Sequence, residues 1–352
     1  MLGMTQPPLN ADELDIEDRA ALEAYLIAAG RARSGELASH KVLAGGVSSR
    51  TVLATFTDGR AWVLKQSLAK LRVPGEWFSD PSRVHREALG MQVLGAITPA
   101  GSIPRLIFDD ERHHVLAMEA VPEPHENWKT MLLRGDVDLD LVKEFGLLLG
   151  GIHGTSFNSL ESLDRTFADR SFFESLRLHP YYETAAAAEP RAAEFYRTLI
   201  ADTRARQISL VHGDYSPKNV LIHKGKLVLL DHEVIHLGDP AFDVGFALTH
   251  FLSKAHHLPK HRDDFADAAI VFWDNYGILS RFFSLDRALR SERCARHALG
   301  CLLARVVGRS PLEYLSAEER ARQREAVVRL IADPPPDVFD LVDRFVEEIE
   351  RD

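Results

Sequence analysis

The residues best able to carry out chemistry lie in one short stretch, residues 210–233. It holds His212, Asp214 and Asn219 in the order His-Gly-Asp-Tyr-Ser-Pro-Lys-Asn, and an apolar run then leads to Asp231. Carboxylate and amide oxygens are ligands that Mg²⁺ prefers, and a carboxylate can also accept the proton of an alcohol. The set therefore fits metal-assisted transfer of a phosphoryl group to a hydroxyl. The alternative is a β-hairpin whose Asp and Asn side chains only cap turns.

A lysine and a glutamate earlier in the chain supply groups that a bound nucleotide would need. Lys65 ends a strand-like run, and Glu87 lies in a predicted helix over residues 82–94. A strand lysine can contact the phosphates of ATP while a helix glutamate holds it. Ahead of the strand-like run at 51–56, four small residues could donate hydrogen bonds to phosphates: Gly45, Gly46, Ser48 and Ser49. The same residues are equally typical of a simple hairpin turn.

The elements that must position these groups form two sets. After a helix predicted at 15–29, short β runs are predicted at 42–44, 51–56 and 61–65, with a hairpin turn at Asp58-Gly59. Strands at 105–108 and 115–120 follow the helix at 82–94, and Pro122 and Pro124 then mark a break. We therefore predict an N-terminal lobe at residues 1–121.

Beyond this break the chain is mostly helical and forms a predicted C-terminal lobe, residues 122–352. The periodicity of apolar residues predicts helices at 137–155, 190–206, 263–284, 287–307, 317–332 and 338–350. The stretch at 210–233 is the β-hairpin within them. A β-rich lobe followed by a helical lobe predicts an α+β fold with two lobes.

The order of these motifs resembles the aminoglycoside phosphotransferase and choline kinase superfamily. The segment from Leu64 to Trp77 is similar to the one around the ATP lysine in 5-methylthioribose kinases, which also have Asp-x-Glu where this chain has Asp231-His-Glu233. In the catalytic loop those kinases carry His-Gly-Asp-Leu-His-Thr-Gly-Ser, whereas Asn219 of the loop here is more similar to aminoglycoside kinases. They also carry an Arg pair on a C-terminal helix, of which this chain offers only Arg305.

This resemblance implies a protein-kinase-like bilobal fold with MgATP between the lobes. It implies that Asp214 is the catalytic base that orients a substrate hydroxyl, that Lys65 contacts the phosphates, and that Glu87 holds Lys65. Three residues are implied to serve the metal, with Glu233 either supporting the ligands or binding a second ion: Asn219, Asp231 and Glu233.

The resemblance also implies contacts for the rest of the nucleotide and for the acceptor. Adenine would bond to the backbone near Glu119 and Val121, and the acceptor would contact Trp77 and Arg305. Asp243 would either cap a helix or brace the catalytic loop.

The implied function is an ATP-dependent kinase acting on a sugar or sugar-like alcohol, similar to methylthioribose kinase. The alternative within this chemistry is an aminoglycoside- or choline-type kinase. The alternative of another class is a non-catalytic nucleotide-binding regulator. Loss of Lys65, Asp214 or Asp231 would favour the regulator, and all three residues are present. Because related sugar kinases are often dimers, a homodimer is a possible assembly.

Composition narrows the partners further. The formal net charge of −10 over 352 residues argues against nucleic acid or an anionic membrane surface as a partner. Neither a secretory signal nor a run of about 18 apolar residues is seen, so a cytoplasmic location is expected. Cys294 and Cys301 are expected to be reduced core residues, and the pairs His113-His114 and His256-His257 are expected at the surface.

Overall fold

The computed structural model describes residues 14–43, 47–73, 76–163, 165–280 and 287–351. The chain divides into two compact units, one formed by residues 1–93 and 104–122 and the other by residues 94–103 and 123–352. None of the helices within the described ranges is long and apolar enough to cross a membrane.

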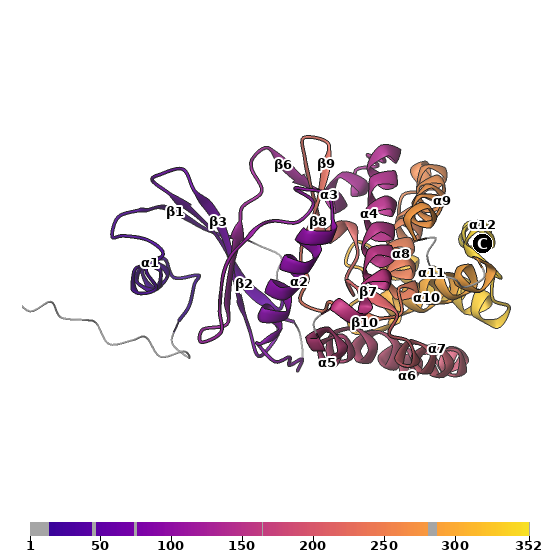
Figure 1. The fold of residues 1–352 in the computed structure, drawn as a ribbon. Coiled ribbons are helices and arrows are strands. Elements are labelled where there is room, and N and C mark those ends of the chain that lie inside the picture. Colours follow the sequence, from indigo (N-terminus) through magenta and orange to yellow (C-terminus); the bar gives the residue numbers. More distant parts are fainter. Residues whose placement is uncertain (1–13, 44–46, 74–75, 164, 281–286, 352) are drawn as a thin grey trace, which may run out of the picture. The chain divides into compact units, whose positions relative to one another are not determined.

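The first unit is built on an antiparallel sheet of five strands (Figure 1). Its order is β1-β2-β3-β5-β4, and the strands are β1 (Leu37–Val42), β2 (Ser49–Phe56), β3 (Ala61–Ser67), β4 (Leu106–Asp110) and β5 (Val115–Glu119). The predicted hairpin turn joins β2 to β3, and Gly59 adopts a φ of +88° there, which glycine tolerates best. The first strand lies earlier than the predicted run at 42–44, and residue 44 falls outside the described residues.

One face of this sheet carries the core of the first unit. Alternate residues of β2 are buried, as expected for a strand with one covered face. Leu22 and Leu26 of α1 (Arg19–Ala28) belong to the same buried cluster as Val52 and Leu64 of the sheet. The second helix, α2 (Arg83–Ile97), follows the sheet's first three strands and carries Glu87. The sheet and α2 thus fix where Lys65 and Glu87 lie.

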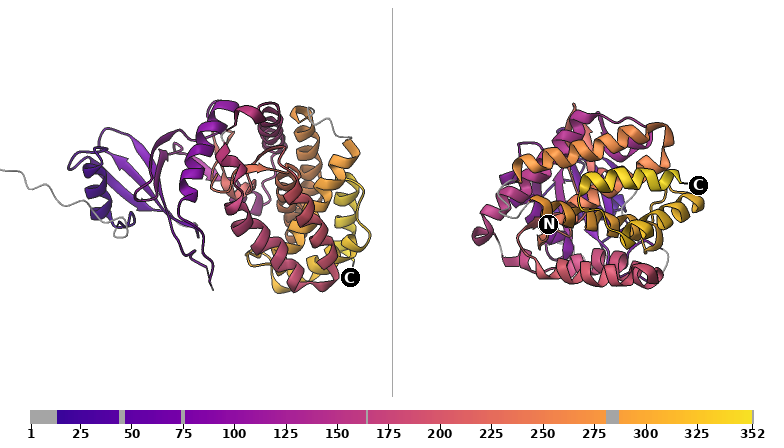
Figure 2. Two further views of the ribbon diagram at one scale, coloured as in Figure 1. Left: turned by 60° about the horizontal axis from the view of Figure 1, so that its bottom comes forward. Right: turned by 90° about the vertical axis from the view of Figure 1, so that its right-hand side faces the viewer.

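The second unit is mostly helical (Figure 2). Its longer helices are α4 (Leu139–Asn158), α7 (Ala193–Ala205), α8 (Ala241–His257), α9 (Arg262–Leu279), α10 (Arg287–Val307), α11 (Ala317–Ala332) and α12 (Val338–Glu350). Helix α4 packs along α9, and α8 packs along both α9 and α10. At Gly150 of α4 a side chain would meet the carbonyl oxygen of Tyr276 at 2.5 Å, so glycine permits the close crossing with α9.

Shorter elements complete this unit. They are α3 (Trp128–Leu133), α5 (Ser171–Phe173), α6 (Thr184–Ala188), the π-helix η3 (Glu174–Glu183) and the 3₁₀ helices η1 (Leu160–Ser162), η2 (Arg165–Ala168), η4 (Pro190–Ala192), η5 (Pro217–Asn219) and η6 (Pro259–His261). Two small sheets join them, with the orders β6-β8-β9 and β10-β7. Their strands are β6 (His125–Asn127), β7 (Ser209–Val211), β8 (Val220–His223), β9 (Lys226–Leu229) and β10 (His236–Gly238).

The helix α8 is the main element that the sequence patterns did not predict. Every residue from Ala241 to His256 is buried, so this helix has no solvent-exposed face of the kind that marks a surface helix in a sequence. Cys294 and Cys301 are buried, unpaired thiols, as predicted. His256 contradicts the prediction of a surface residue, because it is buried and its Nε2 bonds to the carbonyl oxygen of Glu319 at 3.0 Å.

Candidate active site

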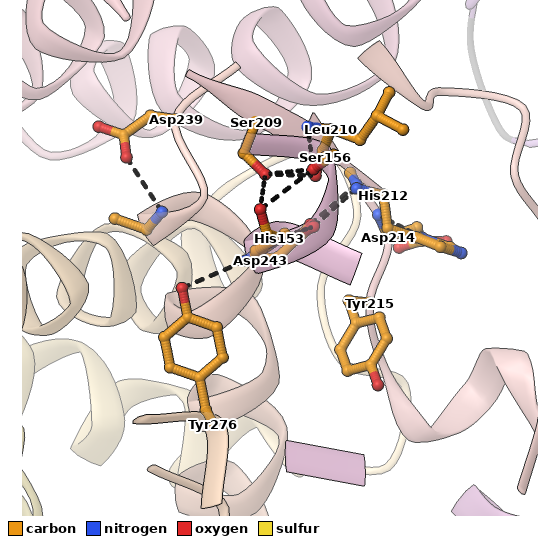
Figure 3. Close-up of polar contacts among 12 residues, drawn as sticks. His153, Ser156, Ser209, Leu210, His212, Asp214, Tyr215, Asp239, Asp243 and Tyr276 are labelled. Atoms are coloured by element: carbon orange, nitrogen blue, oxygen red, sulfur yellow. Dashed lines mark hydrogen bonds and ion pairs between the residues drawn. The ribbon is translucent and has the colours of Figure 1, made fainter. Parts of the chain in front are cut away.

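The segment predicted as a catalytic loop lies between β7 and β8. Strand β7 is tied to α4, because Leu210 donates its amide to Ser156 Oγ at 3.0 Å and the hydroxyls of Ser156 and Ser209 lie 2.8 Å apart (Figure 3). Gly213 adopts a φ of +79°, and a Cβ there would lie 2.7 Å from Val234 Cγ2. Glycine is therefore required between His212 and Asp214.

Asp243 of α8 holds the backbone of this loop. Its Oδ2 accepts the amide of His212 at 2.6 Å and its Oδ1 accepts the amide of Gly213 at 2.8 Å. On the far side, His153 Nε2 lies 3.2 Å from Asp243 Oδ2, and the Tyr276 hydroxyl lies 3.2 Å from His153 Nδ1 (Figure 3). Of the two predicted roles for Asp243, bracing the catalytic loop is confirmed.

The electrostatics of this brace favour a charged aspartate and a neutral histidine. Burial alone would raise the pKa of Asp243, but hydrogen bonds from His153 and Gly213 and electrostatic interactions with His153 and His212 lower it below its usual value. Burial lowers the pKa of His212, against the raising effect of nearby carboxylates. His212 Nδ1 accepts the Asp214 amide at 3.2 Å, so its proton is on Nε2, which lies 3.2 Å from the carbonyl oxygen of Leu230.

The side chain of Asp214 is held through one of its two oxygens. Asn219 Nδ2 donates to Asp214 Oδ2 at 2.7 Å, and it also donates to the Asp214 carbonyl oxygen at 3.0 Å. Arg177 Nη2 lies 3.0 Å from the same Oδ2. The other carboxylate oxygen, Oδ1, takes no part in these contacts and can receive a further hydrogen bond. The next residue anchors the loop, since the Tyr215 hydroxyl donates to the Phe145 carbonyl oxygen at 2.8 Å.

Arg177 is the main residue of this site that sequence reasoning missed. It comes from η3, and its Nε donates to the Gly213 carbonyl oxygen at 2.7 Å. Its Nη1 also donates to the carbonyl oxygen of Leu176 at 2.8 Å. Burial would lower the pKa of Arg177, but neighbouring charges, that of Asp214 foremost, raise it above the usual value. No local motif pointed to it, because it acts across 36 residues of sequence.

The three residues predicted to serve a metal lie close together in this unit. Leu230 donates its amide to the Asn219 carbonyl oxygen at 2.8 Å, which continues the β8–β9 pairing up to Asp231. Asp231 adopts a φ of +66°, and Glu233 is buried. Because both amide hydrogens of Asn219 serve Asp214, its Oδ1 is the atom available to a cation.

The donor set suits a cation that also uses ligands from a bound phosphate. Among the described residues, no three His, Cys, Asp or Glu side chains are placed together to hold a metal ion. Mg²⁺ in nucleotide sites commonly takes one or two protein oxygens and fills the rest of its shell with phosphates and water. The oxygens of Asn219 and Asp231 fit that pattern.

In the first unit, the predicted lysine and glutamate are paired. Lys65 Nζ lies 2.8 Å from Glu87 Oε1 and 2.6 Å from Oε2, and the side chain of Glu87 is only 1% exposed. The pair joins β3 to α2. It leaves Lys65 held at one end by a buried carboxylate, as a phosphate-binding lysine would require.

The residues predicted to form a phosphate loop are described in part. Gly45 and Gly46 lie outside the described residues. The carbonyl oxygen of Ser48 accepts the Leu68 amide at 2.9 Å and also a hydrogen bond from Arg83 Nη2, and Ser49 is buried at the start of β2. The buried Arg83 further donates to the carbonyl oxygens of Leu68 and Asp80, so it fixes the base of this segment.

The remaining predicted residues lie in different places. Glu119 ends β5, its amide donates to the Arg105 carbonyl oxygen at 2.9 Å, and Val121 follows as a half-buried residue. Trp77 is half-buried, and its carbonyl oxygen accepts the Leu71 amide. In the second unit, Arg305 of α10 donates to the Tyr181 hydroxyl at 3.3 Å.

Comparison with known proteins gives a consistent result. The model of the phosphotransferase enzyme family matches residues 39–279 of the chain. No curated protein matches it. Among solved structures, the amicoumacin kinase hAmiN, in complex with AMP-PNP, Ca²⁺ and Ami, has a TM-score of 0.59 and 14% identity, covering 91% of this chain and 96% of its own.

Two further structures with organisms named are similar. Macrolide 2′-phosphotransferase MphH from Brachybacterium faecium has a TM-score of 0.53 and 16% identity, covering 90% of this chain and 98% of its own. Choline kinase LicA from Streptococcus pneumoniae has a TM-score of 0.52 and 15% identity, covering 90% and 99%. The predicted α+β, protein-kinase-like fold is confirmed.

Proposed function

The chain belongs to the phosphotransferase enzyme family and is a small-molecule phosphotransferase, and we propose that it transfers the γ-phosphate of MgATP to a hydroxyl of a sugar or sugar-like alcohol. The observation that carries this proposal is the way in which the Asp214 side chain and its loop are held. Its Oδ2 is held by Asn219 and Arg177, while the loop around it is braced by Asp243. A carboxylate held in this way can present its second oxygen to an acceptor hydroxyl.

Asp214 would orient the acceptor hydroxyl and accept its proton as the oxygen attacks phosphorus. The ion pair with Arg177 and the hydrogen bond from Asn219 fix the orientation of this carboxylate. His212 would not serve as the base, because its Nδ1 accepts the Asp214 amide and its Nε2 bonds to the Leu230 carbonyl oxygen. It positions the loop backbone.

We propose contacts to the phosphates and to the adenine of the nucleotide. We assign Lys65 to its phosphates, with Glu87 holding the lysine, and the segment Gly45, Gly46, Ser48 and Ser49 to further phosphate contacts. Adenine would bond to the backbone at Glu119 and Val121. Because the Glu119 amide already donates to Arg105, its carbonyl oxygen is the group we assign to adenine.

Mg²⁺ would be held by Asn219 Oδ1 and Asp231, with Glu233 either supporting them or holding a second ion. The bound ion would supply charge neutralisation on the phosphate oxygens. The complex of amicoumacin kinase with AMP-PNP and Ca²⁺ supports the use of a nucleotide together with a divalent cation. Trp77 and Arg305 are proposed contacts of the acceptor, and the homodimer and the cytoplasmic location stay predictions.

Choline- and aminoglycoside-type acceptors are the competing choice, and similar structures include a choline kinase. A non-catalytic nucleotide-binding regulator is disfavoured because the held Asp214 would have no role in it.

The acceptor is tested by measuring ADP release from MgATP with methylthioribose, other pentoses, choline, homoserine and aminoglycosides. The Asp214→Ala variant is the blank, and Asp263→Asn, a change at an exposed position in the first turn of α9, is the matched control. Acceptor-dependent ADP release by the wild type and the control, and none by the blank, supports the proposal. Equal release by wild type and Asp214→Ala would contradict it, and turnover of choline or aminoglycosides alone would replace the sugar by a cationic acceptor.

A further inference from the structure

Four basic residues of the second unit gather around one buried histidine, His250 of α8. We call Lys129, Lys218, Lys254 and Arg305 the cationic cluster; they come from α3, η5, α8 and α10. Burial first, and then the positive charges of all four residues, lower the pKa of His250 well below its usual value. Their charges therefore act on one place although they are far apart in the sequence.

Lys254 is the most unusual member of the cluster. It is fully buried, its Nζ donates to the His250 carbonyl oxygen at 3.0 Å, and it lies 5.5 Å from the centre of the Tyr314 ring. In the described part of the chain no carboxylate forms an ion pair with it. Burial, and then the charge of Lys129, lower its pKa to about 7. A buried ammonium without a counter-charge is costly, so it is seldom kept for stability alone.

The charges around Lys254 do not cancel. Glu313 is the acidic residue that acts on it, and Glu313 already forms an ion pair with Lys129. The chain as a whole carries a formal net charge of −10, so the excess of positive charge at the cluster is opposite in sign to the charge of the whole protein. Such a local excess is what a site for a negatively charged group requires.

Two buried nitrogens at the cluster have no hydrogen-bond partner among the described residues. His250 is 5% exposed, and within the described residues its Nε2 has no hydrogen-bond partner. The same is true of Nε of Arg305, which is 9% exposed. Buried polar atoms of a folded protein are nearly always paired, so these two point to a ligand that is bound during function.

The cluster adjoins the catalytic loop. Lys218 directly precedes Asn219 in η5. Two arginines approach the Tyr181 ring, with Arg177 5.7 Å and Arg305 5.6 Å from its centre. Arg177 is the residue that binds Asp214. A molecule that offered its hydroxyl to Asp214 would therefore have positive charges within reach of its other end.

We propose that the cationic cluster binds a carboxylate or phosphate group of the acceptor, so that the substrate of this phosphotransferase is an anionic alcohol. This inference rests on the proposed function and narrows its substrate class to a sugar acid, another hydroxy acid or a sugar phosphate. Choline and aminoglycosides are cationic, and the cluster would repel them.

The affinity for such an anion depends on the charge of Lys254. The groups that face this lysine are His250 on its own helix, Lys129 of α3, Arg305 of α10, and Glu313 with Tyr314 in the segment before α11. A bound anion stabilises the ammonium, so binding takes up a proton when Lys254 starts out neutral. Anion affinity should therefore be highest below pH 7 and fall as the pH rises above it.

The experiment measures binding of inorganic phosphate and of glycolate by titration calorimetry at pH 6.5, with saturating Mg²⁺ and AMP-PNP. The variant is Lys254→Met, which keeps the length of the side chain and removes its charge. The control is Lys260→Met, a change at an exposed lysine in η6. We expect at least one of the two anions to bind the wild type and the control, and to bind Lys254→Met at least tenfold more weakly. Phosphate alone would indicate a sugar phosphate, and glycolate alone a hydroxy acid.

A melting temperature separates this role from a structural one. Because Lys254→Met removes a buried charge, its melting temperature should equal or exceed that of the wild type. If the variant does not fold, Lys129→Met, which alters a half-buried member of the cluster, should weaken the same anion at least threefold. Equal anion binding by wild type and variants, or no anion binding by the wild type, would overturn the inference. Failure of AMP-PNP to bind would instead count against the proposed function.

Discussion

Replacing Asp243 by asparagine removes the charge that braces the catalytic loop and keeps the shape of the side chain. The carboxylate accepts the amides of His212 and Gly213 on separate oxygens, and His153 approaches one of the two. An asparagine has one acceptor oxygen, so in its better orientation it can serve His212 and His153 but must turn its NH₂ group toward the amide of Gly213.

The cost follows from these contacts. A hydrogen bond to a charged group contributes about 1.5–3 kcal/mol, and a buried N–H left without an acceptor costs about 1–3 kcal/mol. Both ranges include the lost hydrogen bond to the Gly213 amide, so they are not simply added. We expect Asp243→Asn to lower the free energy of unfolding by about 3 kcal/mol. Turnover should also fall by about 100-fold, because the backbone that carries Asp214 would shift.

Urea unfolding at pH 7.5 and ADP release, each with wild type and variant, measure the two effects. The difference in stability should also depend on pH. Because the pKa of Asp243 is lowered in the folded protein, its contribution is present above the unfolded value of about 3.9 and is lost as the pH falls through the folded value. Asp263→Asn, at an exposed position of α9, should stay within about 0.5 kcal/mol of the wild type. An Asp243→Asn protein with wild-type stability and turnover would refute the brace.

Two further predictions concern other parts of the molecule. Lys65→Met removes the cation that pairs with the buried Glu87 carboxylate, so the free energy of unfolding should fall by about 3 kcal/mol. The KM for ATP should rise as well. Urea unfolding and initial-rate measurements test the two effects, and an unchanged KM would contradict the assignment of Lys65 to the phosphates. His297 is fully buried, and burial lowers its pKa to about 4, so the unfolded chain takes up its proton first as the pH falls from 6.5. Between pH 6.5 and pH 4, the free energy of unfolding of the wild type should therefore fall by about 3 kcal/mol more than that of His297→Gln. If the free energies of unfolding of the two proteins changed in parallel with pH, the lowered pKa of His297 would be contradicted.

The sequence predicted the features of the structure that depend on interactions between residues close together in the chain. The bounds of α11 and α12 match the predicted ranges, because each helix is amphipathic and begins after a capping residue, Ser316 or Asp337. The loop from His212 to Asn219 and the residues Lys65 and Glu87 were recognisable because their types and order are set by the chemistry.

Contacts between distant segments could not be predicted in this way. Arg177 reaches the catalytic loop across 36 residues from a π-helix, and nothing in its neighbourhood marks it. The cationic cluster joins four elements through tertiary packing alone. His256 was assigned to the surface because its partner, Glu319, lies 63 residues away. In each case one sequence shows the residue types but not which of them meet.

The central claim, that Asp214 is the catalytic base of a MgATP-dependent phosphotransferase, is tested most directly by comparing ATP binding with phosphoryl transfer in one variant. Asp214→Ala should bind MgATP within a few-fold of the wild-type affinity by titration calorimetry, because Lys65, Asn219 and Asp231 remain. With the acceptor that the wild type uses, the same variant should show no measurable transfer. Transfer at the wild-type rate by Asp214→Ala would contradict the account.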